Sequence, residues 1–285
     1  MLATGGNLGF GAACNLGAER ARGELLLLLN PDAMVASGFR DAIELPLLEE
    51  RGWDAWQALI TAEDGAVINT WGGVTHFTCI SWAGGAGRPA SEAPTEPRDV
   101  AYASGACLAI RRSVWGQVGG FSPEYFLYHE DTDLGLRLWL GGGSVGVEPR
   151  ARCDHDYEFH KGAHKWYFLE RNRLATIVRT YPTRLLLPLL PALLATELAL
   201  LVAAGSGGWL GEKLRAWRDF ARSLPRLIAE RREIRARSVV VIDAGRFAEL
   251  LTPGLDSEYL GAAARSGLLA GLLAGYWRLV RLITG

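Results

Sequence analysis

The sequence contains few cysteines and no strong excess of charge of either sign. Its 285 residues include four cysteines, which lie far apart and form no Cys-x-x-Cys pair. This spacing argues against a zinc ribbon and against a disulfide-dense scaffold, and it favours a reducing compartment. Thirty Lys and Arg residues nearly balance 31 Asp and Glu residues, which gives a formal net charge of -1. Since a global basic field is absent, we expect no nucleic-acid partner.

Two further absences concern the start of the chain. The first residues, MLATGGNLGFG, lack a basic start followed by an apolar run. No secretory signal is therefore visible, and we expect the protein on the cytoplasmic side. The same residues lack the buried apolar strand with which a doubly wound α/β domain normally begins, so we expect the natural domain to start before Met1. The 49% hydrophobic and 21% charged residues are typical of a globular protein.

The first strong pattern is a helix followed by a strand. Small and apolar residues recur at helical spacing over 10–22, and Gly23 then ends the predicted helix. The run ELLLLL at 24–29 predicts a parallel strand that is buried on both faces. Asn30 and Asp32 follow at its carboxyl end, the edge where open α/β sheets bind ligands. A carboxylate there can hold Mg²⁺ or Mn²⁺ against diphosphate oxygens; a simple turn cap is the alternative.

The sequence predicts further elements of an α/β fold. Residues 37–50 are typical of a helix, and the segment 53–69 contains at least one strand, AWQALI. Residues 102–110 are apolar and small, which predicts another buried strand. Between them, 70–98 is rich in Gly, Pro, Ser and Thr, so we expect a long and partly irregular surface segment.

Three acids gather in the segment FLYHEDTDLGLRLWL, residues 126–140. Glu130, Asp131 and Asp133 fall at the start of a predicted helix, where the helix macrodipole stabilises negative charge. A purely structural role is therefore one interpretation. The other is acid–base chemistry, because a carboxylate beside a second carboxylate has a raised pKa that suits a general base.

Histidines and arginines follow in the next segment. His155 lies in the sequence CDHDY, and His160 and His164 come soon after it; a histidine beside carboxylates can ligate a metal. No His-Glu-x-x-His motif is present, which argues against a zincin, and we expect His160 and His164 to be ordinary surface or core side chains because only His155 has a matching motif partner. Arg171 and Arg173 have planar guanidinium groups that suit diphosphate recognition, whereas solvated ion pairs on a helix are the alternative.

The character of the sequence changes beyond Tyr181. We therefore predict a partial catalytic domain over 1–181 and a helical membrane-proximal region over 182–285. Within the second region, 185–204 is long and apolar enough to span a bilayer, although two prolines and Glu197 interrupt it.

Two more segments of the tail are amphipathic or apolar. Residues 212–237 contain nine basic and four acidic side chains with apolar residues at helical spacing, the pattern of a basic helix on an anionic membrane surface. The stretch 268–283 is apolar and glycine-spaced. We expect association with a membrane surface; a helical subdomain without lipid and a true span are the alternatives.

Four segments in this order resemble a family 2 glycosyltransferase, and in particular its bacterial rhamnosyltransferase-like branch. They are NLGFGAACNLG, ELLLLLNPDA, ASGACLAIRRSVWGQVGGFSPEYFLYHEDTDLGLRL, and HDYEF with KWYFLERNR. The resemblance covers 5–181 closely and the tail more loosely. It implies an α/β fold of the GT-A type, a Rossmann-like mixed sheet for nucleotide-diphospho-sugars. The first strand and helix of that fold would lie before Met1.

The resemblance also implies roles for individual residues. Asp131, with Glu130 beside it, matches the acid pair that supplies the general base. Asp32 and His155 match groups that hold the donor diphosphate through a divalent metal, Mg²⁺ or Mn²⁺. The matches to the other donor-side positions are Asn7, Gly9, Asn15, Asn30, Ser104 and Gly105.

The implied activity is an inverting transfer of a sugar from a nucleotide-diphosphate donor to a hydroxyl group. The donor would be a deoxysugar such as dTDP-rhamnose, and the acceptor a lipid-linked or cell-envelope glycan at the cytoplasmic face of the inner membrane. Two alternatives stay open. One is a truncated, inactive remnant that acts as a binding or scaffold protein, and the other is a metal hydrolase built on His155, His160 and His164.

Overall fold

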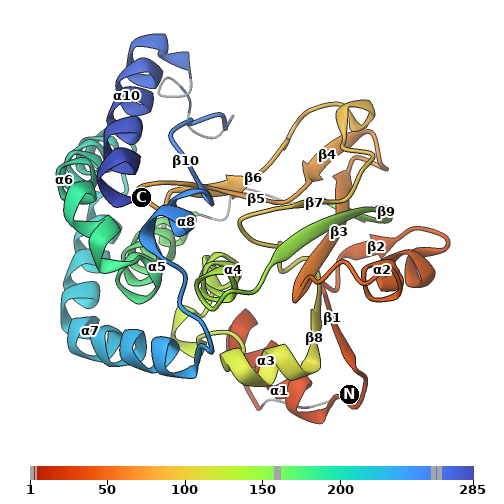
Figure 1. Cartoon of the computed structure of the whole chain (residues 1–285). Helices are drawn as coiled ribbons and strands as arrows, with labels where there is room; N and C mark the ends of the chain where they lie inside the picture. The colour runs from red at the N-terminus through yellow and green to blue at the C-terminus, as the bar shows by residue number, and fades with distance from the viewer. Residues whose placement is uncertain (1–2, 4, 157–161, 258–260, 262–264) are drawn as a thin grey trace.

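The computed structural model describes residue 3 and residues 5–156, 162–257, 261 and 265–285. Figure 1 shows a mixed β-sheet with helices on both faces and a group of long helices beside it. The sheet consists of β1 (Leu25–Leu29), β2 (Ala33–Val35), β3 (Ala55–Ala62), β4 (Val67–Thr70), β7 (Arg98–Asp99), β8 (Cys107–Arg111) and β9 (Val145–His155). Its order is β1-β8-β3-β9-β2, with β4 paired to β3 and β7 paired to β9. The predicted mixed α/β architecture is therefore confirmed.

The centre of the sheet contains the buried parallel strands that we expect, whereas its edge strand β1 is antiparallel and partly exposed. β3 and β9 are parallel, and all residues of β3 except the last are buried. The prediction for 24–29 was wrong in two respects: β1 pairs antiparallel with β8, and it lies at the end of the strand order. Because one face of this edge strand is not covered, Leu27 is 43% and Leu29 40% exposed, whereas Leu26 and Leu28 are buried.

Helices cover the two faces of the sheet. They are α1 (Phe10–Arg20), α2 (Phe39–Leu48), α3 (Arg112–Val118) and α4 (Glu130–Leu140). Phe39 and Ile43 of α2 pack on one face, against Trp56. Trp115 of α3 and Leu134 of α4 pack on the other face, together with partly buried residues of α1.

The segment 70–98 is the surface segment that its composition predicts only in its second half: none of residues 85–98 is buried, whereas most of residues 72–82 are. It forms β5 (Gly73–His76), β6 (Ser81–Ala83) and the short 3₁₀ helix η1 (Ala90–Glu92), and β5 pairs with the distant strand β10 (Leu251–Thr252). Phe77 and Cys79 are fully buried, and Phe77 stacks on Trp277 with ring centroids 5.0 Å apart. Apolar side chains between the glycines are therefore part of a core that composition alone did not reveal.

The tail forms a helical layer that shares this core. Its helices are α5 (His164–Thr180), α6 (Thr183–Ser206), α7 (Leu210–Arg237), α8 (Ala244–Ala248) and α10 (Gly267–Thr284). One buried cluster contains Leu136 of α4, Leu185 of α6, Phe247 of α8 and Trp277 of α10. The proposed division after Tyr181 thus separates two parts of the chain that share a hydrophobic core.

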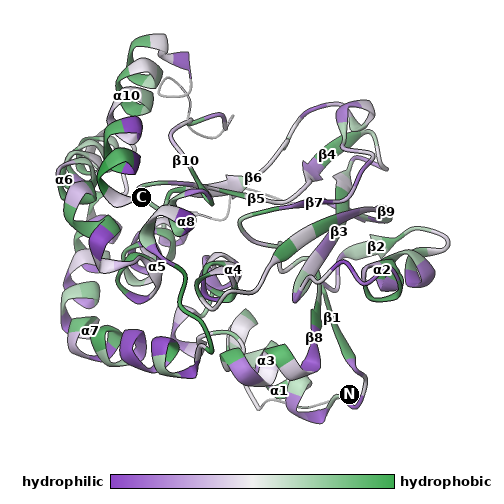
Figure 2. Ribbon diagram, viewed as in Figure 1, coloured by the Kyte–Doolittle hydropathy of each residue, from purple (hydrophilic) through white to green (hydrophobic). Residues whose placement is uncertain are grey.

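Most of the exposed large apolar side chains of the tail lie on α6 and α10, and Figure 2 shows hydrophobic stretches along both helices. Both helices are long and apolar enough to cross a membrane, by length and composition only. The apolar side of α7 instead faces the protein in part: Leu227 is 2% exposed and packs with Tyr125 and Ala175. The predicted basic helix exists, but α5 covers much of its apolar side.

Candidate active site

The carboxyl end of β1 and the end of β9 meet at one edge of the sheet. Nδ2 of Asn30 lies 3.3 Å from Nε2 of His155, and a carboxylate oxygen of Asp32 lies 3.2 Å from the same nitrogen. The strand pairing explains this approach, because Ala33 is in register with His155. His155 is buried, whereas the side chain of Asp32 is 65% exposed. The edge thus presents an accessible carboxylate beside an imidazole.

A turn at residues 104–106 connects this edge to the acids of α4. The backbone N–H of Asn30 donates to the carbonyl of Ala106 at 3.0 Å. The N–H of Gly105 faces Oδ2 of Asp131 at 3.4 Å, and Oγ of Ser104 accepts from the N–H of Ala106 at 3.3 Å. Asp131, Gly105, Asn30, Asp32 and His155 therefore gather in one region, although they are up to 125 residues apart in sequence.

Glu130 and Asp131 form a carboxylate pair at the start of α4. Burial and then the charge of Asp131 raise the pKa of Glu130 to about 8. Burial raises the pKa of Asp131 as well, against the N–H groups of Thr132 and Gly105, which favour the charged form. Oε2 of Glu130 has no hydrogen-bond partner among the described residues. Neighbouring carboxylates with raised pKa values are typical of acid–base groups.

The N-terminal residues of the predicted site lie against the loop that precedes α4. Gly9 has φ 81°, and a Cβ atom there would lie 2.5 Å from the carbonyl oxygen of Phe126, so only glycine fits. Oδ1 of Asn7 accepts from the N–H of Gly9 at 3.0 Å. Asn15 pairs with the backbone of Phe121 through both ends of its amide, at 2.8 and 3.0 Å. Its polar atoms thus anchor α1, a structural role that we did not expect.

The two predicted arginines of α5 do not lie at the strand edge with Asp32. Arg173 is 2% exposed, and its guanidinium group contacts Glu170 and Glu197 and donates to the carbonyl of Thr78. A group enclosed by two carboxylates is not accessible to a diphosphate, so this prediction was wrong. Arg171 donates to the carbonyl of Glu124 at 2.7 Å and thus binds the loop before α4.

Sequence reasoning missed Asn172, which lies between these arginines and is fully buried. Its Nδ2 atom lies within 3.0 Å of the carbonyl oxygens of Tyr125, Leu127 and Tyr128. The available signal was weak: an amide next to two charged residues on a helix is common on protein surfaces, and nothing local showed that this one faces inward.

The described part of the chain shows no metal site at the other predicted histidines. His160 lies outside the described residues, and His164 begins α5 with its ring against Phe168. The described residues contain no group of three or more His, Cys, Asp or Glu side chains that could hold a metal ion. The metal hydrolase interpretation therefore has no site in that part of the chain.

A partial metal site does fit the residues at the strand edge. Mg²⁺ commonly uses one or two protein carboxylates and completes its coordination with substrate phosphates and water. The exposed carboxylate of Asp32 beside Nε2 of His155 matches this incomplete set of ligands.

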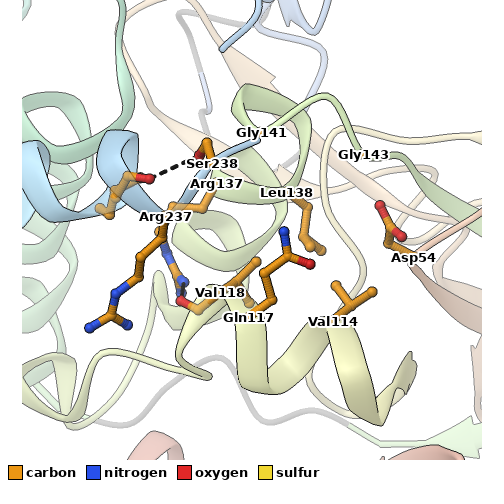
Figure 3. A pocket seen from close by; sticks show the side chains of 11 residues that line it. Asp54, Val114, Gln117, Val118, Arg137, Leu138, Gly141, Gly143, Arg237 and Ser238 are labelled. Carbon is orange, nitrogen blue, oxygen red and sulfur yellow. Dashed lines mark hydrogen bonds between the residues drawn. The ribbon is translucent and has the colours of Figure 1, made fainter. Parts of the chain in front are cut away.

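A pocket shown in Figure 3 lies between α3, α4 and the end of α7. Its polar lining includes Asp54, Gln117, Arg137 and Arg237, and none of the predicted site residues is among its lining residues. The candidate active site is thus an open edge rather than this pocket.

A comparison with known families decides what kind of site this is. The model of glycosyl transferase family group 2 matches residues 39–206, which is well over half of the chain. The chain belongs to glycosyl transferase family group 2. This membership confirms the family that the four sequence segments resemble.

Proteins with known names are similar to parts of the chain. An N-acetylglucosaminyl-diphospho-decaprenol L-rhamnosyltransferase of Mycobacterium tuberculosis is 34% identical over 178 residues, covering 54% of this chain and 58% of that protein. The O-antigen biosynthesis protein RfbC of Myxococcus xanthus is 29% identical over 153 residues, covering 50% of this chain and 12% of that protein. The chain thus spans less than two thirds of these relatives.

Solved glycosyltransferase structures resemble the chain more distantly. GalNAc-T7 with UDP, GalNAc and Mn²⁺ is 18% identical and has a TM-score of 0.46, covering 60% of this chain and 34% of that one. The mannosyltransferase PcManGT of Pyrobaculum calidifontis, in complex with GDP-Man and Mn²⁺, is 16% identical with a TM-score of 0.41, covering 81% of this chain and 66% of that one.

Proposed function

We propose that the chain acts as an inverting glycosyltransferase, which moves a sugar from a nucleotide-diphosphate donor to a hydroxyl group of a lipid-linked glycan. One observation carries the proposal: the turn at 104–106 joins Asp131 to the edge that presents Asp32 and His155. Family membership supports the reaction class, and the name of the mycobacterial relative supports a lipid-linked acceptor and the transfer of rhamnose, for which we propose dTDP-rhamnose as the donor.

In this proposal Asp131 is the general base. An acceptor hydroxyl is a weak nucleophile, so its proton passes to the carboxylate of Asp131 while its oxygen bonds to the anomeric carbon. The bond from that carbon to the diphosphate breaks in the same displacement, which inverts the configuration. The N–H of Gly105 faces Oδ2 of Asp131 and helps to orient the carboxylate. Burial raises the pKa of Asp131, which makes its carboxylate a better proton acceptor.

The donor diphosphate would lie at Asp32 and His155. We propose that these two residues hold Mg²⁺ or Mn²⁺, which when bound stabilises the negative charge on the departing diphosphate. Asn30 lies beside this pair, with its Nδ2 atom 3.3 Å from Nε2 of His155, and a metal bound at that nitrogen would replace this contact. Ser104 and Gly105 form the turn between donor and base.

Transfer assays with the full chain test this function. With dTDP-rhamnose and a polyprenyl-diphosphate-linked N-acetylglucosamine acceptor, we expect product from the unmodified chain. Asp131→Asn should lower turnover by about 10² or more, because the general base is lost. Donor affinity, measured by calorimetry, should be largely kept. Full turnover by Asp131→Asn would contradict the assignment of the base, and donor binding without transfer by the unmodified chain would favour the inactive binding protein.

We also propose that the helical layer lies on the membrane surface rather than spanning the bilayer. Glu197, within the apolar helix α6, contacts Arg173 of α5 and Lys213 of α7, the latter at 2.8 Å. These buried contacts hold one side of α6 against the protein. The side opposite the buried Leu185 and Leu189 is apolar and exposed, and it consists of Leu187, Leu190, Leu194, Leu198 and Val202.

The neighbouring helix α10 extends this surface. It packs beside α6, where the Tyr276 hydroxyl donates to the Pro188 carbonyl, and it exposes Leu268, Leu272, Leu279, Leu282 and Ile283. Two helices that pack on the protein with one side and expose apolar side chains on the other suit attachment to a membrane surface. Basic residues of α7, including the 71% exposed Arg222, favour an anionic leaflet.

Flotation with anionic vesicles tests the surface. The double variant Leu194→Asp/Leu198→Asp should lose most of its vesicle binding, because two charges replace apolar contact with lipid. Leu48→Asp is the matched control, since Leu48 is 74% exposed but lies on α2. Equal flotation of the double variant and the unmodified chain would contradict the proposed surface.

A further inference from the structure

The loop that leads into the acid pair has an unusual backbone. Phe126, Tyr128 and His129 have φ values of 57°, 66° and 66°. Side chains other than glycine rarely adopt this left-handed region, so three such residues within four positions persist only where the surroundings hold them. Glu130 and Asp131 follow directly. The conformation of this loop therefore sets where both carboxylates lie.

One side chain of α5 holds most of this loop. Nδ2 of Asn172 donates to the carbonyl oxygens of Tyr125, Leu127 and Tyr128, at 3.0, 2.9 and 2.8 Å. An amide has two N–H bonds, so one of them is shared between two carbonyls. Since Asn172 is fully buried, water cannot replace these contacts.

The orientation of the amide is fixed from its other end. Nε of Arg171 donates to Oδ1 of Asn172 at 2.9 Å, and Nη2 of Arg171 donates to the carbonyl of Glu124 at 2.7 Å. Arg171 is itself held over the ring of Tyr167, 5.2 Å from the centroid. The two side chains thus bind the carbonyls of Glu124, Tyr125, Leu127 and Tyr128 in one loop.

From these contacts we infer that Asn172 and Arg171 are positioning residues for the proposed base, Asp131. This inference rests on the proposed function, because positioning matters only if Asp131 takes the acceptor proton. It assigns Arg171 to the loop before α4 in place of the donor diphosphate. Neither residue touches Asp131; both act through the backbone of residues 124–128.

Steady-state kinetics with the full chain test the inference. Asn172→Ala should lower kcat by about 10²-fold, because a misplaced catalytic group reacts slowly even when substrate binds. The KM for the nucleotide sugar should change by less than about threefold, since the strand edge with Asp32 is untouched. Arg171→Lys keeps the charge but cannot bind both oxygens, and it should lower kcat by about tenfold. If Arg171 bound the diphosphate, the same variant would instead raise KM and keep kcat.

Thr180→Val is the matched control for the loss of a buried polar group on α5. Thr180 is fully buried, and its hydroxyl donates to the carbonyl of Thr176 within the same helix. We expect kcat within about twofold of the unmodified chain. A loss of kcat in Thr180→Val as large as in Asn172→Ala would reduce the effect to general destabilisation and overturn the inference. If Asn172→Ala does not fold, the kcat and KM of the Arg171→Lys variant test the inference, because Arg171 is only half-buried.

A double variant separates this inference from the proposed function. Asp131→Asn/Asn172→Ala should be no slower than Asp131→Asn alone, within about threefold, because both changes remove the same step. Multiplying effects would show that Asn172 acts independently of Asp131, and would overturn the inference while leaving the base intact. Full activity of Asp131→Asn would instead overturn the proposed base. Unchanged kcat in Asn172→Ala, with Asp131→Asn inactive, would refute only the positioning role.

Discussion

Two buried acids in the first turn of α4 lie in opposite electrostatic surroundings. Burial raises the pKa of Glu130 to about 8, and the charge of Asp131 adds to this effect. Burial acts on Asp133 in the same direction, but the charges of Arg179 and Arg137 outweigh it and lower the pKa of Asp133 to about 2. Each arginine places its Nε atom 2.7 Å from a carboxylate oxygen of Asp133. Both acids lie in the same helical turn, so their position does not explain the difference between their pKa values. The difference arises because two arginines face Asp133.

The contrast extends to the helical layer. Arg173 and Lys213 compensate Glu170 and Glu197 between α5, α6 and α7, in an arrangement that is buried almost throughout. Buried ion pairs of this kind hold the three helices in one arrangement, because removing one partner would leave the other as an unpaired buried charge. The acid pair of Glu130 and Asp131 lies instead beside the open strand edge. The comparison teaches that the uncompensated acids are the ones available for proton transfer.

The largest expected effect is a loss of stability when the buried ion pairs of Asp133 are removed. Asp133→Asn removes a carboxylate that faces both Arg137 and Arg179, and it should lower the free energy of unfolding by about 3–5 kcal/mol at pH 7. Urea denaturation measures this loss. Because the folded pKa of Asp133 lies below its ordinary value, its stabilisation is present above about pH 4 and is lost as pH falls towards 2.

A surface pair provides the control for that prediction. Arg40 and Glu44 lie 3.6 Å apart on α2, and the side chain of Arg40 is 87% exposed. Arg40→Ala should change the free energy of unfolding by less than about 0.5 kcal/mol, since water already solvates both charges. Similar losses in Arg40→Ala and Asp133→Asn would erase the distinction between buried and exposed pairs.

Removing the charge of Glu130, which no cation in the described part of the chain compensates, should instead increase the free energy of unfolding. Glu130→Gln removes the cost of a buried negative charge, so at pH 8 to 9 the variant should unfold less readily, by roughly 1–3 kcal/mol. The raised pKa gives the pH window: the unmodified chain loses stability as pH rises from about 4.5 to about 8, because the unfolded state has released a proton that the folded state retains. Thermal unfolding across this range should show a flatter profile for Glu130→Gln. A destabilised variant at pH 9 would contradict the raised pKa.

Local sequence predicted the elements better than their surroundings. Helical spacing located α1 and α2, and the run AWQALI located β3, because those signals are contained in adjacent residues. The same reasoning failed for β1, since a run of leucines does not reveal which strands lie beside it. Its edge position follows from antiparallel pairing with β8, about 80 residues later.

The site shows the same limit. The gathering of Asp32, Asp131 and His155 follows from the rule that sites form at strand ends, together with the family resemblance. The surroundings of Arg173 did not follow, because a guanidinium group binds carboxylate and diphosphate with the same geometry. Only the folded chain shows that Glu197, 24 residues later on another helix, is its partner.

The smallest expected effect is a pKa change within the acid pair itself. Asp131→Asn removes the second cause of the raised pKa of Glu130 and leaves the first, which is burial. The pKa of Glu130 should therefore fall by about one unit and stay above 4.5. Carbon-13 NMR of side-chain carboxyl groups measures it, with Asp133 as the internal control, because the two arginines that lower the pKa of Asp133 are unchanged. If Glu130 titrated near 4.5 in the unmodified chain, the two acids of α4 would share one environment, and the reason for assigning the base to this pair rather than to Asp133 would be lost.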